Sequence, residues 1–289
     1  MGAGPLGLIP DPPGVPSLSP SAAPAGWGED APIRVRYLGG FSFTNSRRPT
    51  DPWKPSRIRT LFSYLLINRN KVVLKEKLHS LLWPTTLYDS DASGLKVTVH
   101  ALRKALEMRA GDTPDAFDLR YEDYGYVLHT GGAVWVDVDE FEALTNQTRI
   151  AEACHEVTTV DELCERAATL YRGDFLAGET GEWVTEQREW LRSIALRVMH
   201  LLTRNAMSRG DSSAATTYCR RTLEVDPCDE ETYRTLMLVH ARRGELGQVK
   251  RWHELCTRRL SEHLEIAPAE ATDRLLHRVL GSRLADSAP

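Results

Sequence analysis

One stretch of the chain, from about Asp91 to Met108, combines helical spacing with side chains suited to the edges of DNA bases. Successive residues of an α-helix are about 100° apart, so one face gathers four apolar residues, Leu95, Val99, Leu102 and Leu106. The opposite face and its flanks carry basic and small apolar residues, Lys96, Val97, His100, Ala101, Arg103 and Lys104. Basic side chains reach base acceptors or phosphates, and Val or Ala packs on the thymine methyl group. This face predicts a DNA-reading helix, and the alternative is a solvated basic face with one stray valine.

Further candidate contacts lie on both sides of this helix in the sequence. Arg120 suits a phosphate or the minor groove, and Tyr124 follows it in the same predicted hairpin, where packing is the alternative role for the tyrosine. Arg57 and Arg59 begin an earlier helix, whose N-terminus favours an anion such as a phosphate. Simple solvated charge is an equally good interpretation of these two arginines.

The elements around these residues must hold them in place, and their order predicts a winged helix. Alternation of apolar and basic residues predicts a strand over residues 33–37, which Gly39 and Gly40 interrupt before a second strand at 41–43. Helical spacing follows at 56–67, at a short segment ending near Trp83, and at 91–108. Two short strands, 118–121 and 126–129, then flank a turn. Strands, three helices and a hairpin form a winged helix-turn-helix, whose third helix enters the major groove.

The distribution of charge supports a polyanionic partner for this part of the chain. Residues 33–109 carry 15 Lys and Arg against 5 Asp and Glu, whereas residues 110–289 carry 21 against 32. A basic module joined to an acidic one suggests that only the first meets a polyanion.

The rest of the chain is predicted to be helical, and part of its sequence is repeated. Apolar spacing of three and four predicts helices over 139–151, 159–172, 183–208, 212–225, 229–242 and 245–261. Arg209-Gly210-Asp211 returns 34 residues later as Arg243-Gly244-Glu245, which is the tetratricopeptide period. Leu223–Pro227 returns as Leu264–Pro268, seven residues later than that period requires, so the second copy has a longer helix or an insertion.

The predicted fold class is therefore mainly α with small β elements, a winged helix-turn-helix domain followed by an all-α tetratricopeptide-like repeat domain. We expect a disordered Pro/Gly/Ala-rich leader over residues 1–32, because eight of the sixteen prolines lie there. The winged helix is expected over 33–132, the helical domain over 133–280 and a tail over 281–289.

Several function classes find no support in the sequence. There is no nucleophile elbow, H-E-x-x-H motif, phosphate-cradling loop or run of 18 apolar residues. We therefore expect no enzyme, no catalytic residue, no metal, no cofactor and no membrane partner. The five cysteines form no C-x-x-C pair, which favours reduced thiols and a cytoplasmic protein.

Two segments carry a resemblance to known families. Leu81-Leu82-Trp83, a polar loop, and the run from Val97 to Leu106 resemble the winged helix of OmpR/PhoB-type response regulators. Residues 136–141 and 171–176 resemble the opening of the bacterial transcriptional activator domain. In this order the pair resembles a Streptomyces antibiotic regulatory protein (SARP). The position before the second helix, often Ser or Thr in the family, is Leu74, and the position before Leu95, often Asn, is Gly94.

The resemblance implies a transcriptional activator of a secondary-metabolite (antibiotic) gene cluster, acting at the nucleoid. Such activators bind direct repeats in double-stranded promoter DNA, with a second protomer alongside, and recruit RNA polymerase holoenzyme through its sigma and alpha subunits. It also implies that the loop between the second and third helices faces polymerase. Here the exposed residues of that loop would be Thr85, Thr86, Leu87 and Tyr88.

Two other functions stay open on the sequence alone. The first is a protein-interaction scaffold, in which the repeats bind a partner peptide and the basic module is incidental. The second is a DNA-binding regulator whose helical domain senses a small effector, which requires apolar pockets between the helix pairs. A repressor also stays open, because DNA affinity alone does not fix the sign of regulation.

Overall fold

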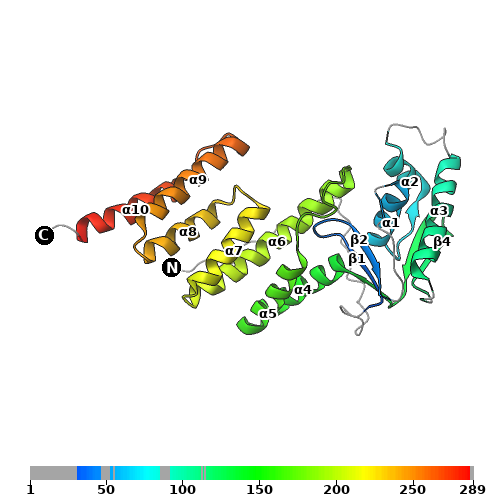
Figure 1. The fold of residues 1–289 in the computed structure, drawn as a ribbon, viewed down its shortest axis with the longest axis horizontal. Helices are drawn as coiled ribbons and strands as arrows, with labels where there is room; N and C mark the ends of the chain where they lie inside the picture. The colour runs from blue at the N-terminus through cyan, green and yellow to red at the C-terminus, as the bar shows by residue number, and fades with distance from the viewer. Residues whose placement is uncertain are drawn as a thin grey trace.

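The computed structural model describes residues 31–46, 53–54, 56–84, 92–111, 113 and 115–286. Their elements form an elongated molecule, with the small sheets and first helices at one end and α9 and α10 at the other (Figure 1). The first part comprises β1 (Ile33–Arg36), β2 (Ser42–Asn45), α1 (Arg57–Ile67), β3 (Val73–Leu74), α2 (Lys75–Leu82), α3 (Ala92–Ala110), β4 (Phe117–Glu122), β5 (Gly125–Thr130) and β6 (Val134–Val136). The second part comprises α4 (Asp137–Ala153), α5 (Val157–Leu170), α6 (Glu182–Ser208), α7 (Ser212–Val225), α8 (Glu230–Arg242), α9 (Leu246–Leu264) and α10 (Glu270–Asp286). The predicted fold class is confirmed.

The winged helix has its expected three helices and hairpin. Strands β4 and β5 pair antiparallel from Phe117 opposite Thr130 to Glu122 opposite Gly125, which leaves a two-residue turn. Both turn residues, Asp123 and Tyr124, have positive φ, at 43° and 65°. Such turns match the twist of the flanking strands, so the hairpin projects as a narrow wing.

Strand β3, which the sequence pattern does not predict, adds an edge to the wing sheet in the order β3-β5-β4. Gly125 makes this pairing possible, because a Cβ at that position would lie 2.3 Å from the Val73 carbonyl oxygen. The pairing ties the start of α2 to the wing, and Leu74 begins α2 without a side-chain cap, as the sequence predicts.

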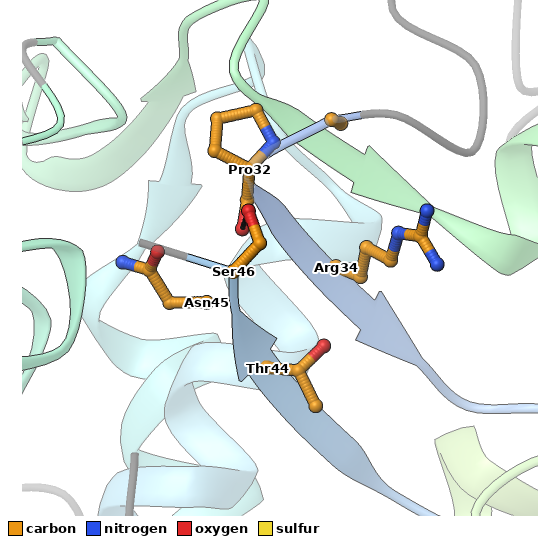
Figure 2. Close-up of a pocket in the computed structure, with 6 residues that line it drawn as sticks. Pro32, Arg34, Thr44, Asn45 and Ser46 are labelled. Carbon is orange, nitrogen blue, oxygen red and sulfur yellow. Dashed lines mark hydrogen bonds between the residues drawn. The ribbon is translucent and has the colours of Figure 1, made fainter. Parts of the chain in front are cut away.

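A second sheet joins the two parts of the chain. Strand β1 pairs antiparallel with β2 and parallel with β6, which the sequence pattern does not predict either. At its open end, the Ser46 backbone N–H and hydroxyl both donate to the Pro32 carbonyl, at 2.8 and 3.3 Å, beside a shallow hollow (Figure 2). The predicted division near residue 132 therefore falls between two strands, β5 and β6, of which the second pairs with the first strand of the chain.

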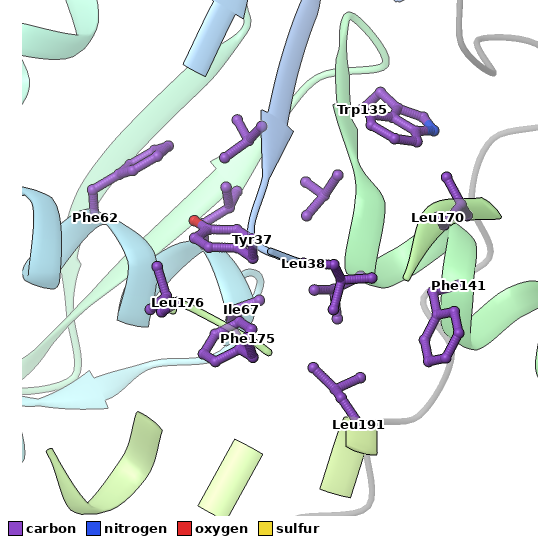
Figure 3. Close-up of a cluster of buried hydrophobic side chains, with 14 of the residues drawn as sticks. Tyr37, Leu38, Phe62, Ile67, Trp135, Phe141, Leu170, Phe175, Leu176 and Leu191 are labelled. Atoms are coloured by element: carbon purple, nitrogen blue, oxygen red, sulfur yellow. The ribbon is translucent and has the colours of Figure 1, made fainter. Parts of the chain in front are cut away.

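One hydrophobic core runs through both parts (Figure 3). Tyr37 at the end of β1 packs on Phe175, with ring centroids 5.5 Å apart, and both side chains are fully buried. Phe62 of α1 and Leu191 of α6 belong to the same cluster. Burying each such side chain contributes about 1.5–3 kcal/mol, so this shared core holds the winged helix against the helices that follow.

The helical part contains the predicted repeat. Gly210 and Gly244 both have φ of 75° and end α6 and α8 in the same left-handed conformation. Ala215 and Val249, which the repeat places in register, are both fully buried. Helix α9 has 19 residues where α7 has 14, so the second copy has the longer helix. Helix α10, which the sequence analysis did not predict, follows Pro268 and buries Leu275 against α8 and α9.

Candidate nucleic-acid interface

Helix α3 is anchored by the face that the sequence predicts. Four side chains are between 0 and 4% exposed and belong to the main core, Leu95, Val99, Leu102 and Leu106. Because this face is fixed against the rest of the winged helix, the opposite face has one defined orientation.

The opposite face of α3 is open to solvent. Lys96, Val97, His100 and Lys104 are all exposed, Val97 by 67%, whereas Ala101 is half-buried. A valine exposed to this extent between cationic side chains gains nothing from the fold itself. The structure thus gathers four predicted reader residues on one surface, with Ala101 at its edge.

Arg103 lies beside this surface and contacts the wing. Its guanidinium donates to the Leu119 carbonyl from Nε at 3.2 Å and from Nη2 at 2.9 Å. Leu119 is in β4, so the contact fixes the angle between α3 and the wing. The geometry gives Arg103 a positioning role, which the helical spacing alone could not reveal.

The wing, residues 117–130, carries one arginine against three carboxylates. Arg120 is exposed and forms an ion pair with Asp118 at 2.6 Å. Glu122 and Asp123 add two carboxylates around Tyr124, which is 83% exposed at the tip. A phosphate approaching Arg120 would therefore compete with Asp118, while the Tyr124 ring is free to stack or pack.

The two arginines at the start of α1 have different environments. Arg57 is exposed and lies over the Trp83 ring, 5.2 Å from its centroid. Arg59 is buried, pairs with Glu179 at 2.5 Å and donates to the Trp53 carbonyl at 2.8 Å. Because Arg59 is buried and paired with Glu179, it is neither a solvated charge nor available to a phosphate. Both interpretations of Arg59 from the sequence are therefore wrong.

The surface that Leu74 and Lys75 form beside the wing was not identified from the sequence. Strand β3 exposes Leu74 by 53%, and the Lys75 ammonium lies 4.5 Å from the centroid of the Tyr121 ring, which is 49% exposed. A two-residue strand leaves no periodic signal, so only the Val73 pairing with Tyr126 reveals this surface.

The predicted polymerase-facing loop lies outside the described residues. This applies to Thr85, Thr86, Leu87 and Tyr88. Trp83, just before this loop, is described: its ring stacks on the ring of the buried His79, with centroids 5.2 Å apart.

Other kinds of site have little basis in the part of the chain that the structure describes. Within that part, no three His, Cys, Asp or Glu side chains are grouped so as to hold a metal ion. No helix in the same residues has the length and apolar character that crossing a bilayer requires. The five cysteines are free thiols, and burial raises the pKa of Cys164 to about 11.

Comparison with known families agrees with both parts of this architecture. Residues 136–280 match the bacterial transcriptional activator domain, and residues 54–128 match the C-terminal domain of transcriptional regulatory proteins. The chain belongs to the bacterial transcriptional activator domain family. Its two matched domains occur in the order of a SARP-type regulator, as the sequence predicts.

One curated protein and one solved structure are similar to most of this chain. The regulatory protein AfsR of Streptomyces coelicolor is 22% identical over 268 residues, which are 93% of this chain and 26% of AfsR. The chain thus spans about a quarter of that relative. The structure of Mycobacterium tuberculosis EmbR, in complex with a low-affinity phosphopeptide, superposes with a TM-score of 0.68 at 19% identity, covering 87% of this chain and 65% of that one. This second likeness shows that the two proteins share a fold over both parts of the chain.

Proposed function

We propose that this family member is a sequence-specific DNA-binding transcriptional activator that reads promoter DNA with α3. The observation that carries the proposal is the exposed face of Lys96, Val97, His100 and Lys104 on a helix whose other face is buried. A recognition helix needs both properties, since base contacts discriminate only when the helix is held in a fixed register.

The other predicted DNA contacts differ in how accessible their side chains are. Ala101 is half-buried at the edge of the same face of α3, and Arg57 and Tyr124 are exposed. Arg120 would contact DNA only by exchanging its bond to Asp118 for one to a phosphate. Arg103 would act by holding the wing against α3.

We further propose how DNA binding leads to activation. Two protomers occupy direct repeats near the promoter of a secondary-metabolite gene cluster. The loop with Thr85, Thr86, Leu87 and Tyr88 faces the sigma and alpha subunits of RNA polymerase holoenzyme. The DNA supplies the effective concentration that holds weak protomer contacts together. These statements rest on the family and on the domain order, and they place the protein at the chromosome in the cytoplasm.

A footprint on promoter DNA from the chain's own genomic neighbourhood tests the proposal, with and without RNA polymerase holoenzyme. We expect protection of two same-orientation repeats on one face of the duplex, strengthened by polymerase. Protection that polymerase does not strengthen would favour a repressor or an effector-gated regulator. A complete lack of protection at low salt would favour the scaffold function, because phosphate contacts are strongest there.

A further inference from the structure

The C-terminal end of α3 is held by a side chain from a distant strand. Asn45, the last residue of β2, is buried, and its Nδ2 donates to the carbonyls of Arg109 and Ala110 at 3.0 and 3.1 Å. The last carbonyls of a helix have no partner within the helix. Asn45 therefore supplies two bonds that α3 cannot make for itself at this end.

Ring contacts hold the same end of α3. The guanidinium carbon of Arg109 lies 4.5 Å from the centroid of the Trp53 ring and 5.9 Å from the centroid of the Phe43 ring. Phe43 belongs to β2 and precedes Asn45 by two residues. The last turn of α3 is therefore both bonded to and packed against this strand.

Hydrogen bonds join α3 to two different sheets. Arg103, near the middle of the helix, bonds to Leu119 of the wing sheet, and the last turn bonds to Asn45 in the sheet of β2, β1 and β6. Apolar packing is non-directional, whereas a hydrogen bond weakens when its angle or length changes. The apolar face of α3 determines which side is buried, and these two bonded contacts determine the tilt of the helix.

The tilt of α3 matters for base contacts because the reader residues lie far from the held end. His100 precedes Ala110 by ten residues, which is about 15 Å along the helix axis. Over that length, a tilt of about 5° at Ala110 would move the backbone at His100 by about 1.3 Å. A hydrogen bond to a base edge tolerates a displacement of only about 0.5 Å, so such a tilt would break it.

We propose that Asn45 is a positioning residue for DNA reading, which sets the tilt of α3 without contacting DNA. This role rests on the proposed function of α3 as the reading helix. Asn45 is buried at the end of α3 that lies far from Lys96, so it acts on the base contacts only through the helix. Because β6 of the same sheet leads directly into α4, the bonds of Asn45 also hold α3 relative to the helical part.

The test compares specific and non-specific DNA affinity of the full chain and of its variant Asn45→Ala, by mobility shift below the melting temperature of both proteins. The probes are the promoter fragment that the footprint identifies and a duplex of the same length with a shuffled sequence. We expect the ratio of the two affinities to fall at least about 5-fold, since the loss of one base contact has this effect. The non-specific affinity should change less than about 2-fold, since phosphate charges dominate it. Partial unfolding alone would lower both affinities equally.

Asn68→Ala is the matched control, because it removes a similar bond from the Asn68 Nδ2 to the Tyr64 carbonyl, 2.9 Å long, at the end of α1. We expect it to lower the melting temperature and to leave the affinity ratio unchanged. Asn45→Thr also lacks the amide and suits a strand, so it takes the place of Asn45→Ala if circular dichroism shows that variant to be poorly folded.

The outcomes separate this role from the proposed function. An affinity ratio that is unchanged in the Asn45 variants, or that falls equally in Asn68→Ala, would refute the positioning role and leave DNA reading by α3 in place. An original chain that binds both probes equally would overturn both proposals.

Discussion

Asp137 and Tyr37 are 100 residues apart in the chain, yet both carboxylate oxygens of Asp137 lie 2.9 Å from the Tyr37 amide nitrogen. One of these oxygens also accepts the Leu38 N–H at 2.9 Å. Asp137 is fully buried at the first turn of α4, and the two amides end β1. This carboxylate therefore joins the first strand of the winged helix to the first helix of the repeat domain.

The Asp137 contact can be tested with Asp137→Asn. The amide oxygen can take the place of the carboxylate oxygen that accepts both N–H groups, but the NH₂ group then faces the Tyr37 N–H, so one buried hydrogen bond is replaced by a contact between two donors. We expect a loss of about 1–3 kcal/mol in the free energy of unfolding at pH 7, measured by urea denaturation. Asp137→Ala leaves both amides without this acceptor and should cost more. Equal stability of the Asn variant and the original chain would contradict the role given to Asp137.

The free energy of unfolding should depend on pH through the side chain of Glu142. Burial, followed by the nearby charge of Asp139, raises the pKa of Glu142 from 4.5 to about 7. The folded state then binds a proton that the unfolded state has lost between about pH 4.5 and 7. The contribution of this group to stability is present below pH 4.5 and is lost as the pH rises through 7.

The variant Glu142→Gln isolates this effect, because it removes the buried charge. Its stability relative to the original chain should rise by about 1–3 kcal/mol between pH 4.5 and 8. Urea denaturation at several pH values measures the difference. A difference that stays constant with pH would show that Glu142 titrates as it does in the unfolded chain.

Removing one partner of the buried ion pair between Arg59 and Glu179 should destabilise the protein far more than removing one partner of an exposed pair. Their side chains are only 9% and 14% exposed, so Glu179→Ala leaves a buried guanidinium without its counter-ion. We expect a loss of about 3 kcal/mol in the free energy of unfolding. Asp118→Ala breaks the exposed pair with Arg120 and should cost less than about 1 kcal/mol. Similar losses in the two variants would argue against burial as the reason.

The exposed face of α3 can be tested with His100→Ala and Lys104→Ala combined. Both side chains are exposed, so folding should be intact, whereas specific DNA binding should be lost. Each good base contact is worth about 1–3 kcal/mol of discrimination. Footprinting measures the binding, circular dichroism checks the fold, and Arg258→Ala on α9 is the control. An unchanged footprint would exclude α3 as the reading helix.

Arg103 should affect DNA binding through the wing. Arg103→Ala removes both hydrogen bonds to the Leu119 carbonyl, so we expect weaker specific binding together with faster amide hydrogen exchange in β4. Lys104→Ala should weaken binding without changing that exchange. If Arg103→Ala weakens binding and leaves the exchange in β4 unaltered, Arg103 contacts DNA directly.

The local elements could be predicted from the sequence because each one repeats a pattern over several turns or strands. The apolar series from Leu95 to Leu106 identifies both faces of α3, since helical geometry alone relates the positions. The two Arg-Gly-acidic turns likewise identify the repeat, because a left-handed glycine must end each helix at that point. The expected lengthening of the second copy, found in α9, follows from the same register.

Other features were decided only by the tertiary structure, because they depend on partners distant in the chain. Arg57 and Arg59 look alike in sequence, but only Arg59 meets Glu179, 120 residues away. Strands β3 and β6 are too short to show alternation and exist because β5 and β1 offer them hydrogen bonds. A local pattern encodes which face of an element is buried. It does not encode which distant carbonyl or carboxylate that face will meet, and for Arg59, Arg103 and Asp137 that partner determines the role.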